Sequence, residues 1–168
     1  AATGAKLNYR KVGNHAITQL ATSPDEKVVA VRTEQGEVLL WQVDAHEAEQ
    51  LPVSGVQGMA WGEGRTLHLA GPRAEKWIIP EPKSRRLIST KAGLSTVRFS
   101  ADRKSVVAVR GDGFVNTWRP DEDDVQEHKV FDSVVKDARF TPDGTQLVAV
   151  ASSEWGSRIV DLATGDIF

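Results

Sequence analysis

Residues 94–118 decide the fold; they read LSTVRFSADRKSVVAVRGDGFVNTW. Three apolar segments, at 94–99, 106–109 and 114–118, are separated by Ser100-Ala101-Asp102 and by Gly111-Asp112-Gly113. Ser, Asp and Gly are turn-forming residues, and short runs rich in Val, Phe and Trp are typical of strands. The stretch therefore predicts three strands joined by tight hairpin turns.

The same pattern occurs four times along the chain. The first three copies carry a tryptophan at the same position of the repeat, namely Trp41, Trp77 and Trp118. These residues lie roughly 40 residues apart, which is the length of one four-stranded repeat unit. The second copy, around residues 56–79, is the most worn. The predicted repeats span residues 3–44, 45–83, 84–124 and 125–168.

The middle segment of each unit predicts a covered strand. Val106-Val107-Ala108-Val109 has no polar face, and a similar run stands at 28–31 and at 147–150. A strand with two apolar faces is expected to be covered on both sides. No stretch of 12 or more residues shows a helical period, so the sequence predicts an all-β fold.

These motifs resemble the WD-repeat family. The Asn14-His15 pair stands where that family has Gly-His, and Ser23-Pro24-Asp25 and Thr141-Pro142-Asp143-Gly144 match its turn. The resemblance implies a β-propeller of four-stranded antiparallel blades, with four repeats forming half or part of a six- to eight-bladed ring. It also implies structural blade positions at His15, Trp41, Trp77, Trp118 and Asp161.

The polar network of the family is incomplete in this chain. Intact members join a His, a Ser or Thr, an Asp and the Trp by hydrogen bonds within a blade. Only the first unit offers a His at that place, His15, whereas Ala92 stands there in the third unit. We therefore expect these blades to depend more on apolar packing than on a polar network.

The two ends of the chain match each other. Ala-Thr-Gly occurs at 2–4 and again at 163–165, so 165–168 is expected to begin an outer strand. Four blades are too few for the usual ring, and unpaired edges and faces recruit partners. The missing blades could come from the same polypeptide, from another chain or from a second copy that completes an eight-bladed ring. A closed four-bladed ring is the less favoured alternative.

Composition limits the function classes. A net charge of -2 argues against a nucleic-acid binder and gives no attraction to acidic membranes, and no apolar run is long enough for a membrane helix. Residues 1–6 lack the apolar core of a signal peptide, and cysteine is absent, which excludes disulfides. The expected location is cytoplasmic, although export remains open.

No motif of catalysis or of cofactor binding stands out. The four histidines lack the spacing of a zinc site, so no metal and no cofactor are expected. His68 lies in an apolar strand and is expected to be a packed core residue. The acidic run 121–124 and the basic patch 83–86 are expected to be solvated loops.

The turns between the second and third strands supply the predicted partner-binding face. An exposed Trp beside Arg residues has the composition of an interface hot spot. The alternative for Trp155 is that it replaces the missing blade Trp in the core. The predicted partner-binding residues are Arg32, Arg73, Arg110, Asp112, Glu154 and Trp155.

These observations favour a non-catalytic protein–protein interaction scaffold that presents loops to a protein or peptide. The alternative is a sensor or regulatory propeller module of a larger signalling ATPase or kinase. A propeller-fold lyase or hydrolase is the least favoured, because the predicted first strands carry no histidine.

Overall fold

The computed structural model describes residues 14–45, 47–79, 83–88, 93–120, 122, 124–153 and 156–168. These residues form four antiparallel sheets of three or four strands, with no helix among them. The first sheet contains β1 (Ile17–Thr22), β2 (Val28–Thr33), β3 (Val38–Gln42) and β4 (Ala48–Gln50). The second contains β5 (Gly58–Trp61), β6 (Thr66–Ala70), β7 (Ala74–Ile78) and β8 (Lys83–Ile88). The third contains β9 (Leu94–Phe99), β10 (Val106–Arg110), β11 (Phe114–Trp118) and β12 (Val125–Lys129), and the fourth contains β13 (Val135–Phe140), β14 (Gln146–Ala151) and β15 (Ser157–Asp161).

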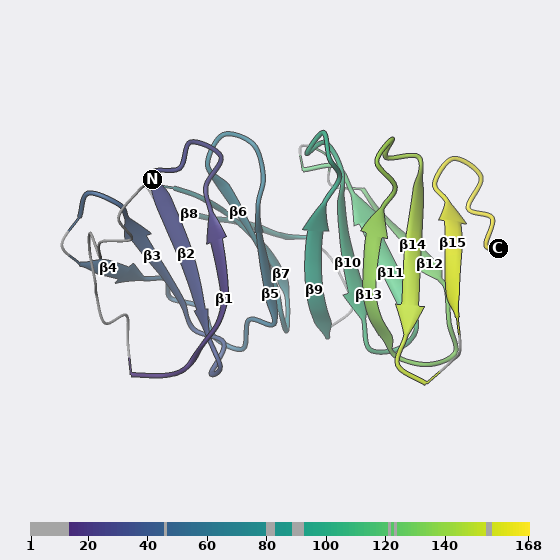
Figure 1. Cartoon of the computed structure of the whole chain (residues 1–168), viewed down its shortest axis with the longest axis horizontal. Coiled ribbons are helices and arrows are strands. Elements are labelled where there is room, and N and C mark those ends of the chain that lie inside the picture. Colours follow the sequence, from purple (N-terminus) through teal and green to yellow (C-terminus); the bar gives the residue numbers. More distant parts are fainter. Residues whose placement is uncertain are drawn as a thin grey trace, which may run out of the picture.

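Each sheet is a meander in which strands follow one another in chain order. The sheets stand side by side in sequence order, with the first and fourth at opposite ends of the row (Figure 1). The turns that join the first two strands of each sheet lie at the top of that view, and we call this end the upper rim. The turns that join the second and third strands lie at the bottom, on the lower rim.

Sheets and sequence repeats are offset by one strand. β4 lies in the second predicted repeat but pairs with β3, so that Trp41 faces Ala48 across the pair. At the end of the chain, Ile159 and Phe168 exchange backbone hydrogen bonds of 2.9 Å, and an isolated bridge joins Val160 to Ile167. The last residues therefore begin a fourth strand beside β15, at the place predicted for an outer strand.

The core consists of three apolar clusters, one between each pair of neighbouring sheets. The first cluster joins Val28 and Leu40 to Met59 and Trp61. The second joins Ala70 and Ala74 to side chains of the third sheet, and the third joins that sheet to the fourth. Face-to-face packing of apolar sheet surfaces thus holds the row together.

Burial of the middle strands depends on their place in the row. β10 is buried at every residue, as its apolar run predicted, and so is β6. β14 carries a similar run, but Val148 and Val150 are each 37% exposed. The prediction of a strand covered on both sides therefore holds for β10, holds for residues 28–31 of β2 except the half-buried Val29, and is wrong for β14.

A hydroxyl and a carboxylate close the first turn in three of the sheets. The Ser23 hydroxyl donates to Asp25 at 2.7 Å, and Ser100 donates to Asp102 at 2.6 Å. Thr141 donates to Asp143 at 2.6 Å. Each hydroxyl also accepts a backbone N–H from the residue five positions later. The second sheet has Gly62-Glu63 at this place and lacks the arrangement, which agrees with its worn sequence.

Two expectations for loops have different outcomes. Residues 83–86 were expected to be a solvated loop, but Lys83–Ile88 is the outer strand β8, because its backbone pairs with β7. Within the acidic run, the described residues Glu122 and Asp124 are exposed and lie outside strands.

Candidate functional site

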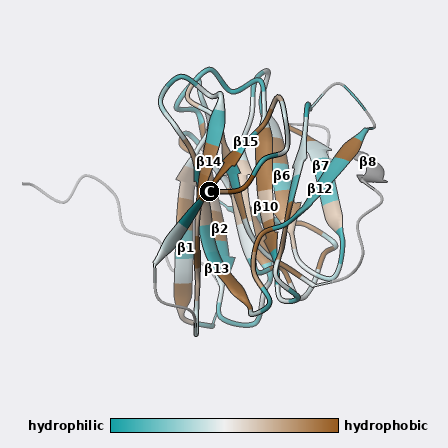
Figure 2. Cartoon of the chain, turned by 90° about the vertical axis from the view of Figure 1, so that its right-hand side faces the viewer, coloured by the Kyte–Doolittle hydropathy of each residue, from teal (hydrophilic) through white to brown (hydrophobic). Residues whose placement is uncertain are grey.

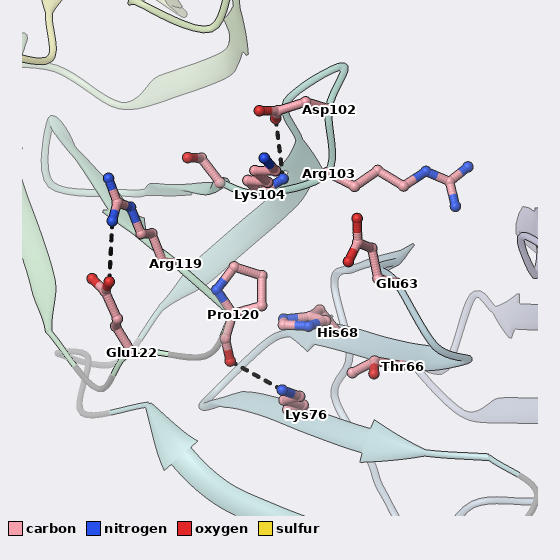
Figure 3. Close-up of a pocket in the computed structure, with 11 residues that line it drawn as sticks. Glu63, Thr66, His68, Lys76, Asp102, Arg103, Lys104, Arg119, Pro120 and Glu122 are labelled. Carbon is pink, nitrogen blue, oxygen red and sulfur yellow. Dashed lines mark hydrogen bonds and ion pairs between the residues drawn. The ribbon is translucent and has the colours of Figure 1, made fainter.

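One cavity lies on the upper rim, between the second and third sheets. Its volume is about 560 Å³, and four segments contribute its walls: β6 with the turn before it, β7, the turn between β9 and β10, and the segment after β11. Figure 3 shows charged side chains around its mouth and His68 at its side. The described lining residues are Glu63, Thr66, His68, Lys76, Asp102, Arg103, Lys104, Ser105, Arg119, Pro120 and Glu122.

His68 is the buried polar group of this cavity. Because side chains alternate along β6, His68 faces the third sheet, where its ring meets Phe99 edge-on at a centroid distance of 4.9 Å. The residue is 1% exposed, and neither ring nitrogen has a hydrogen-bond partner. Burial, followed by the positive charge of Lys76, lowers the pKa of His68 to about 3. The imidazole is therefore neutral at pH 7 and offers one donor and one acceptor.

The mouth of the cavity carries charges of both signs. The Lys76 ammonium donates to the Pro120 carbonyl at 3.0 Å, and Arg119 pairs with Glu122 at 3.1 Å. The Ser100 hydroxyl and the Lys104 backbone N–H hold the pKa of Asp102 below its usual range. Opposite charges alternate around the opening, which suits a polar chain more than a simple ion.

A second cavity of about 510 Å³ adjoins the first, between the third and fourth sheets. Ser105, Arg119 and Glu122 line both cavities, so the two are neighbours on the upper rim. We call these two neighbouring cavities together the rim groove. Its second half is lined mainly by residues of the third and fourth sheets, including Gln126, Thr145 and Asp161.

The rim groove has the chemistry of a binding surface. It combines carboxylates, cations, hydroxyls and one neutral imidazole, all able to donate or accept hydrogen bonds. In the described part of the chain, no three His, Cys, Asp or Glu side chains are grouped so that they could hold a metal ion.

Two of the arginines predicted for the partner-binding face lie at the lower rim. Arg73 is exposed and, with Pro52 and Pro72, lines a shallow cavity of about 250 Å³. Arg32 is half-buried instead, where its guanidinium donates to the Val56 carbonyl at 3.2 Å. Arg32 thereby links the first sheet to the segment that leads into the second.

Arg110 corrects the prediction of an exposed binding residue. Its side chain is 3% exposed and pairs with Glu127 at 2.8 Å and with Asp112. Its guanidinium also lies 4.7 Å from the centre of the Phe114 ring. A buried, neutralised arginine supports the turn between β10 and β11, and only the carboxylate of Asp112 is open to a partner.

The residues predicted as structural blade positions differ in burial and in hydrogen bonding. Trp77 and Trp118 are both 4% exposed, but the Trp77 indole donates to Glu75 at 2.9 Å whereas the Trp118 indole nitrogen has no partner. The half-buried Trp41 donates to the Ala45 carbonyl, and His15 is exposed. Asp161 caps the last turn by accepting the backbone N–H groups of residues 163 and 164.

Glu154 and Trp155 lie outside the described residues, so the lower-rim prediction is not tested at those positions. Sequence reasoning missed the rim groove altogether. The available signal was the repeated Ser/Thr-x-Asp turn, which places ordered polar groups along one rim, together with His68 inside the apolar run 67–70 and Lys76 beside Glu75 in the next strand.

Fold and site together define an all-β protein of four consecutive antiparallel sheets with a polar groove along one rim. The chain is similar to a solved chain of Kuenenia stuttgartiensis hydrazine synthase, with a TM-score of 0.77 at 14% identity. The match covers 97% of this chain and 51% of that one, so this chain spans about half the length of its neighbour. At this identity the likeness shows the fold alone.

No protein-family model and no curated protein matches the sequence. The fold itself is common, since 1265 solved chains match it, and a fold shared so widely hosts many functions. No helix in the described part of the chain has the length and apolarity needed to cross a membrane.

Proposed function

We propose that this chain is a non-catalytic protein–protein interaction scaffold built from WD-repeat propeller blades. In this proposal each sheet is one blade, and the rim groove binds an extended segment of a protein or peptide partner. The proposal places the protein in the cytoplasm and requires no cofactor.

The observation that carries the proposal is that two neighbouring cavities, which share three lining residues, open on one rim at two successive inter-sheet boundaries. A groove shared by three neighbouring sheets can follow an extended chain over several residues. Its alternating charges, such as those of Arg119 and Glu122, can pair with a polar segment. Proteins commonly build a recognition surface from loop residues that a rigid scaffold, such as a set of sheets, holds in place.

The chemistry of the groove supports binding over catalysis. His68, the only histidine among the described residues of the groove, makes no hydrogen bond to a hydroxyl or carboxylate. A nucleophile–base arrangement needs such contacts. The likeness to hydrazine synthase concerns the fold and supplies no reaction to this chain.

Selection from a displayed random-peptide library, with the purified chain as bait, tests the proposal. We expect enriched peptides that bind with micromolar affinity, and we expect Arg119→Glu to weaken them about tenfold by reversing a charge at the groove. The matched control is Arg73→Glu, which reverses an exposed charge on the lower rim.

Because each substitution lies on a different rim, comparing them shows which rim binds the peptides. Loss of binding in Arg119→Glu alone supports the rim groove, and loss in Arg73→Glu alone moves the partner-binding face to the lower rim. Failure to enrich any peptide, or enriched peptides that ignore both substitutions, contradicts the proposed interaction scaffold.

A further inference from the structure

The first strands of the four sheets lie next to one another and form one edge of the row. β1 contacts β5, β5 contacts β9, and β9 contacts β13. Figure 2 looks along the row and shows β1 and β13 on one side, with the outer strands β8 and β12 on the opposite side. We call the edge formed by β1, β5, β9 and β13 the inner edge. Side chains from successive sheets can therefore line one site on this edge.

A cavity of about 350 Å³ lies on the inner edge, where β1, β5 and β9 begin and β2 ends. We call it the inner-edge cavity. Its walls belong to the first three sheets, and it shares no described lining residue with the rim groove. All the lining residues except Gly58 and Val97 have polar side chains. They are Thr18, Gln19, Arg32, Gln57, Gly58, Ser95, Thr96, Val97 and Arg98.

The charged residues among those that line this cavity are two arginines, and none of the described lining residues is acidic. Arg98 is already paired, because its guanidinium donates to both carboxylate oxygens of Asp137, at 3.1 and 3.3 Å. Arg139 donates to the same carboxylate, so two arginines share one negative charge. With Arg32 added, the surroundings of the cavity carry an excess of positive charge, although the whole chain has a net charge of -2.

Arg32 has a hydrogen-bond donor that the fold leaves unused. Its guanidinium donates to the Val56 carbonyl at 3.2 Å, but the buried Nε atom has no partner. No carboxylate in the described part of the chain forms an ion pair with Arg32. Burial lowers the pKa of Arg32, because the charged form loses hydration. A bound anion would offset that cost and would accept charge-assisted hydrogen bonds from the guanidinium.

Uncharged donors lie beside the two arginines. The side chains of Gln57, Ser95 and Thr96 line the cavity and form no hydrogen bond with another described residue. Gly58 allows β5 to approach β9 closely at this point, because a Cβ atom there would lie 3.1 Å from the Thr96 Cα atom. This close approach brings the amide donor of one strand and the hydroxyl donors of the next into the same cavity.

We propose that the inner-edge cavity is an oxyanion site that binds a small ligand through a phosphate group. Arginine recognises phosphate through parallel N–H···O bonds. A phosphate presents oxygens in several directions, which matches donors from β2, β5 and β9, whereas a carboxylate presents its two oxygens in one plane. The volume of about 350 Å³ leaves room for a small organic group on the phosphate. The site lies apart from the rim groove, so it does not rest on the proposed function.

Isothermal titration calorimetry of the purified chain with inorganic phosphate, near neutral pH, tests this proposal. We expect a dissociation constant between about 10 and about 500 μM. Sodium acetate is the matched carboxylate probe and should bind at least about tenfold more weakly, because it lacks the additional oxygens. Ribose 5-phosphate distinguishes the two sources of the group. Tighter binding than that of inorganic phosphate indicates a phosphate monoester, and weaker binding indicates free phosphate.

Two substitutions locate the binding in the inner-edge cavity. Gln57→Glu keeps the size of an exposed side chain but places a negative charge in the cavity, so it should weaken phosphate binding more than about tenfold. The matched control is Gln42→Glu, which adds the same charge at an exposed position of β3 outside this cavity and should leave the affinity unchanged. Arg32→Gln removes a charged donor and should weaken binding by about tenfold.

Circular dichroism of each variant establishes that it remains folded, and the exposed Gln57 provides the test even where Arg32→Gln does not fold. The proposal is overturned by a chain that binds no phosphate up to about 10 mM, a concentration above that of weak specific sites. Acetate that binds as tightly as phosphate overturns it as well. Phosphate binding that survives Gln57→Glu also contradicts it, because the anion then lies elsewhere on the chain. Peptide selection at the rim groove tests the proposed function separately.

Discussion

The boundary between the first two sheets and the boundary between the second and third are built from equivalent strands of successive sheets, but the hydrogen bonds of their buried polar atoms differ. At the first boundary, the Gln19 amide donates to the Met59 carbonyl at 2.8 Å, and the Trp61 indole donates to the Ala21 carbonyl at 2.9 Å. At the second, His68, Asn116 and Trp118 all have buried nitrogen or oxygen atoms without partners.

This difference suggests different roles for the two boundaries: the first stabilises the fold, and the second is available for binding. The first boundary combines large apolar side chains with paired polar groups, which gives both stability and a unique arrangement. The second uses small residues such as Ala70 and Ala74, and some of its buried side chains, those of His68, Asn116 and Trp118, have polar atoms without partners. The largest part of the rim groove opens there. We infer that the second boundary is less stable than the first and is open to a partner.

The largest expected effect is at the first boundary. Trp61→Ala should lower the free energy of unfolding by about 3–5 kcal/mol, because it leaves a cavity among buried side chains and removes the hydrogen bond to Ala21. Urea denaturation followed by circular dichroism measures the change.

A pair of conservative substitutions isolates the hydrogen bond. Trp61→Phe loses it, whereas Trp118→Phe loses none, so the first should cost about 1 kcal/mol more than the second. Equal costs at the two positions would show that the boundaries do not differ in this respect.

The next largest effect is a pH dependence at the second boundary. A histidine with a pKa of about 3 in the folded protein and about 6.5 when unfolded binds its proton more tightly in the unfolded state. Stability therefore falls as the pH drops through this window, by about 2 kcal/mol between pH 6.5 and 4.5. His68→Leu should remove that part of the loss.

Comparing denaturation of the two proteins at both pH values isolates His68. Burial also lowers the pKa of His128, but His128 contributes equally to both proteins. The carboxylate of Asp25, with a pKa of about 2, loses its stabilising effect only at lower pH. The same acid sensitivity in the wild type and in the variant would show that His68 is not held neutral by the fold.

The sequence was sufficient to predict the all-β class and the four successive antiparallel sheets, because the signal for them is local. Apolar runs such as Val106–Val109, with turn residues at both ends, predicted strands, and their recurrence predicted four similar sheets. The outer strand β8 was missed because Lys83-Ser84-Arg85-Arg86 has no apolar alternation. Its strand conformation follows from backbone pairing with β7, which depends on neighbours rather than on its own side chains.

The site could not be predicted in the same way, because its contacts join different strands and sheets. Arg110, at the end of its strand, was predicted to bind a partner, but Glu127, which neutralises it, lies on β12. Nothing at position 110 alone shows that Phe114 and Glu127 enclose its guanidinium. The burial of His68 was predictable from its apolar strand, whereas the cavity beside it depends on turns from two sheets.

The smallest expected effect, and the only gain in stability, comes from Asn116. This side chain is completely buried in β11, and neither its amide oxygen nor its amide nitrogen has a partner. Burying an unpaired amide costs free energy, so Asn116→Leu, which has the same branched shape, should raise the free energy of unfolding by about 1 kcal/mol. The matched variant Gln19→Leu removes a paired amide at the first boundary and should lower it by about 1 kcal/mol. Opposite signs at the two positions support the contrast between the boundaries. A loss at both would show that the fold uses Asn116 as it uses Gln19, and that the second boundary is closed rather than open to a partner.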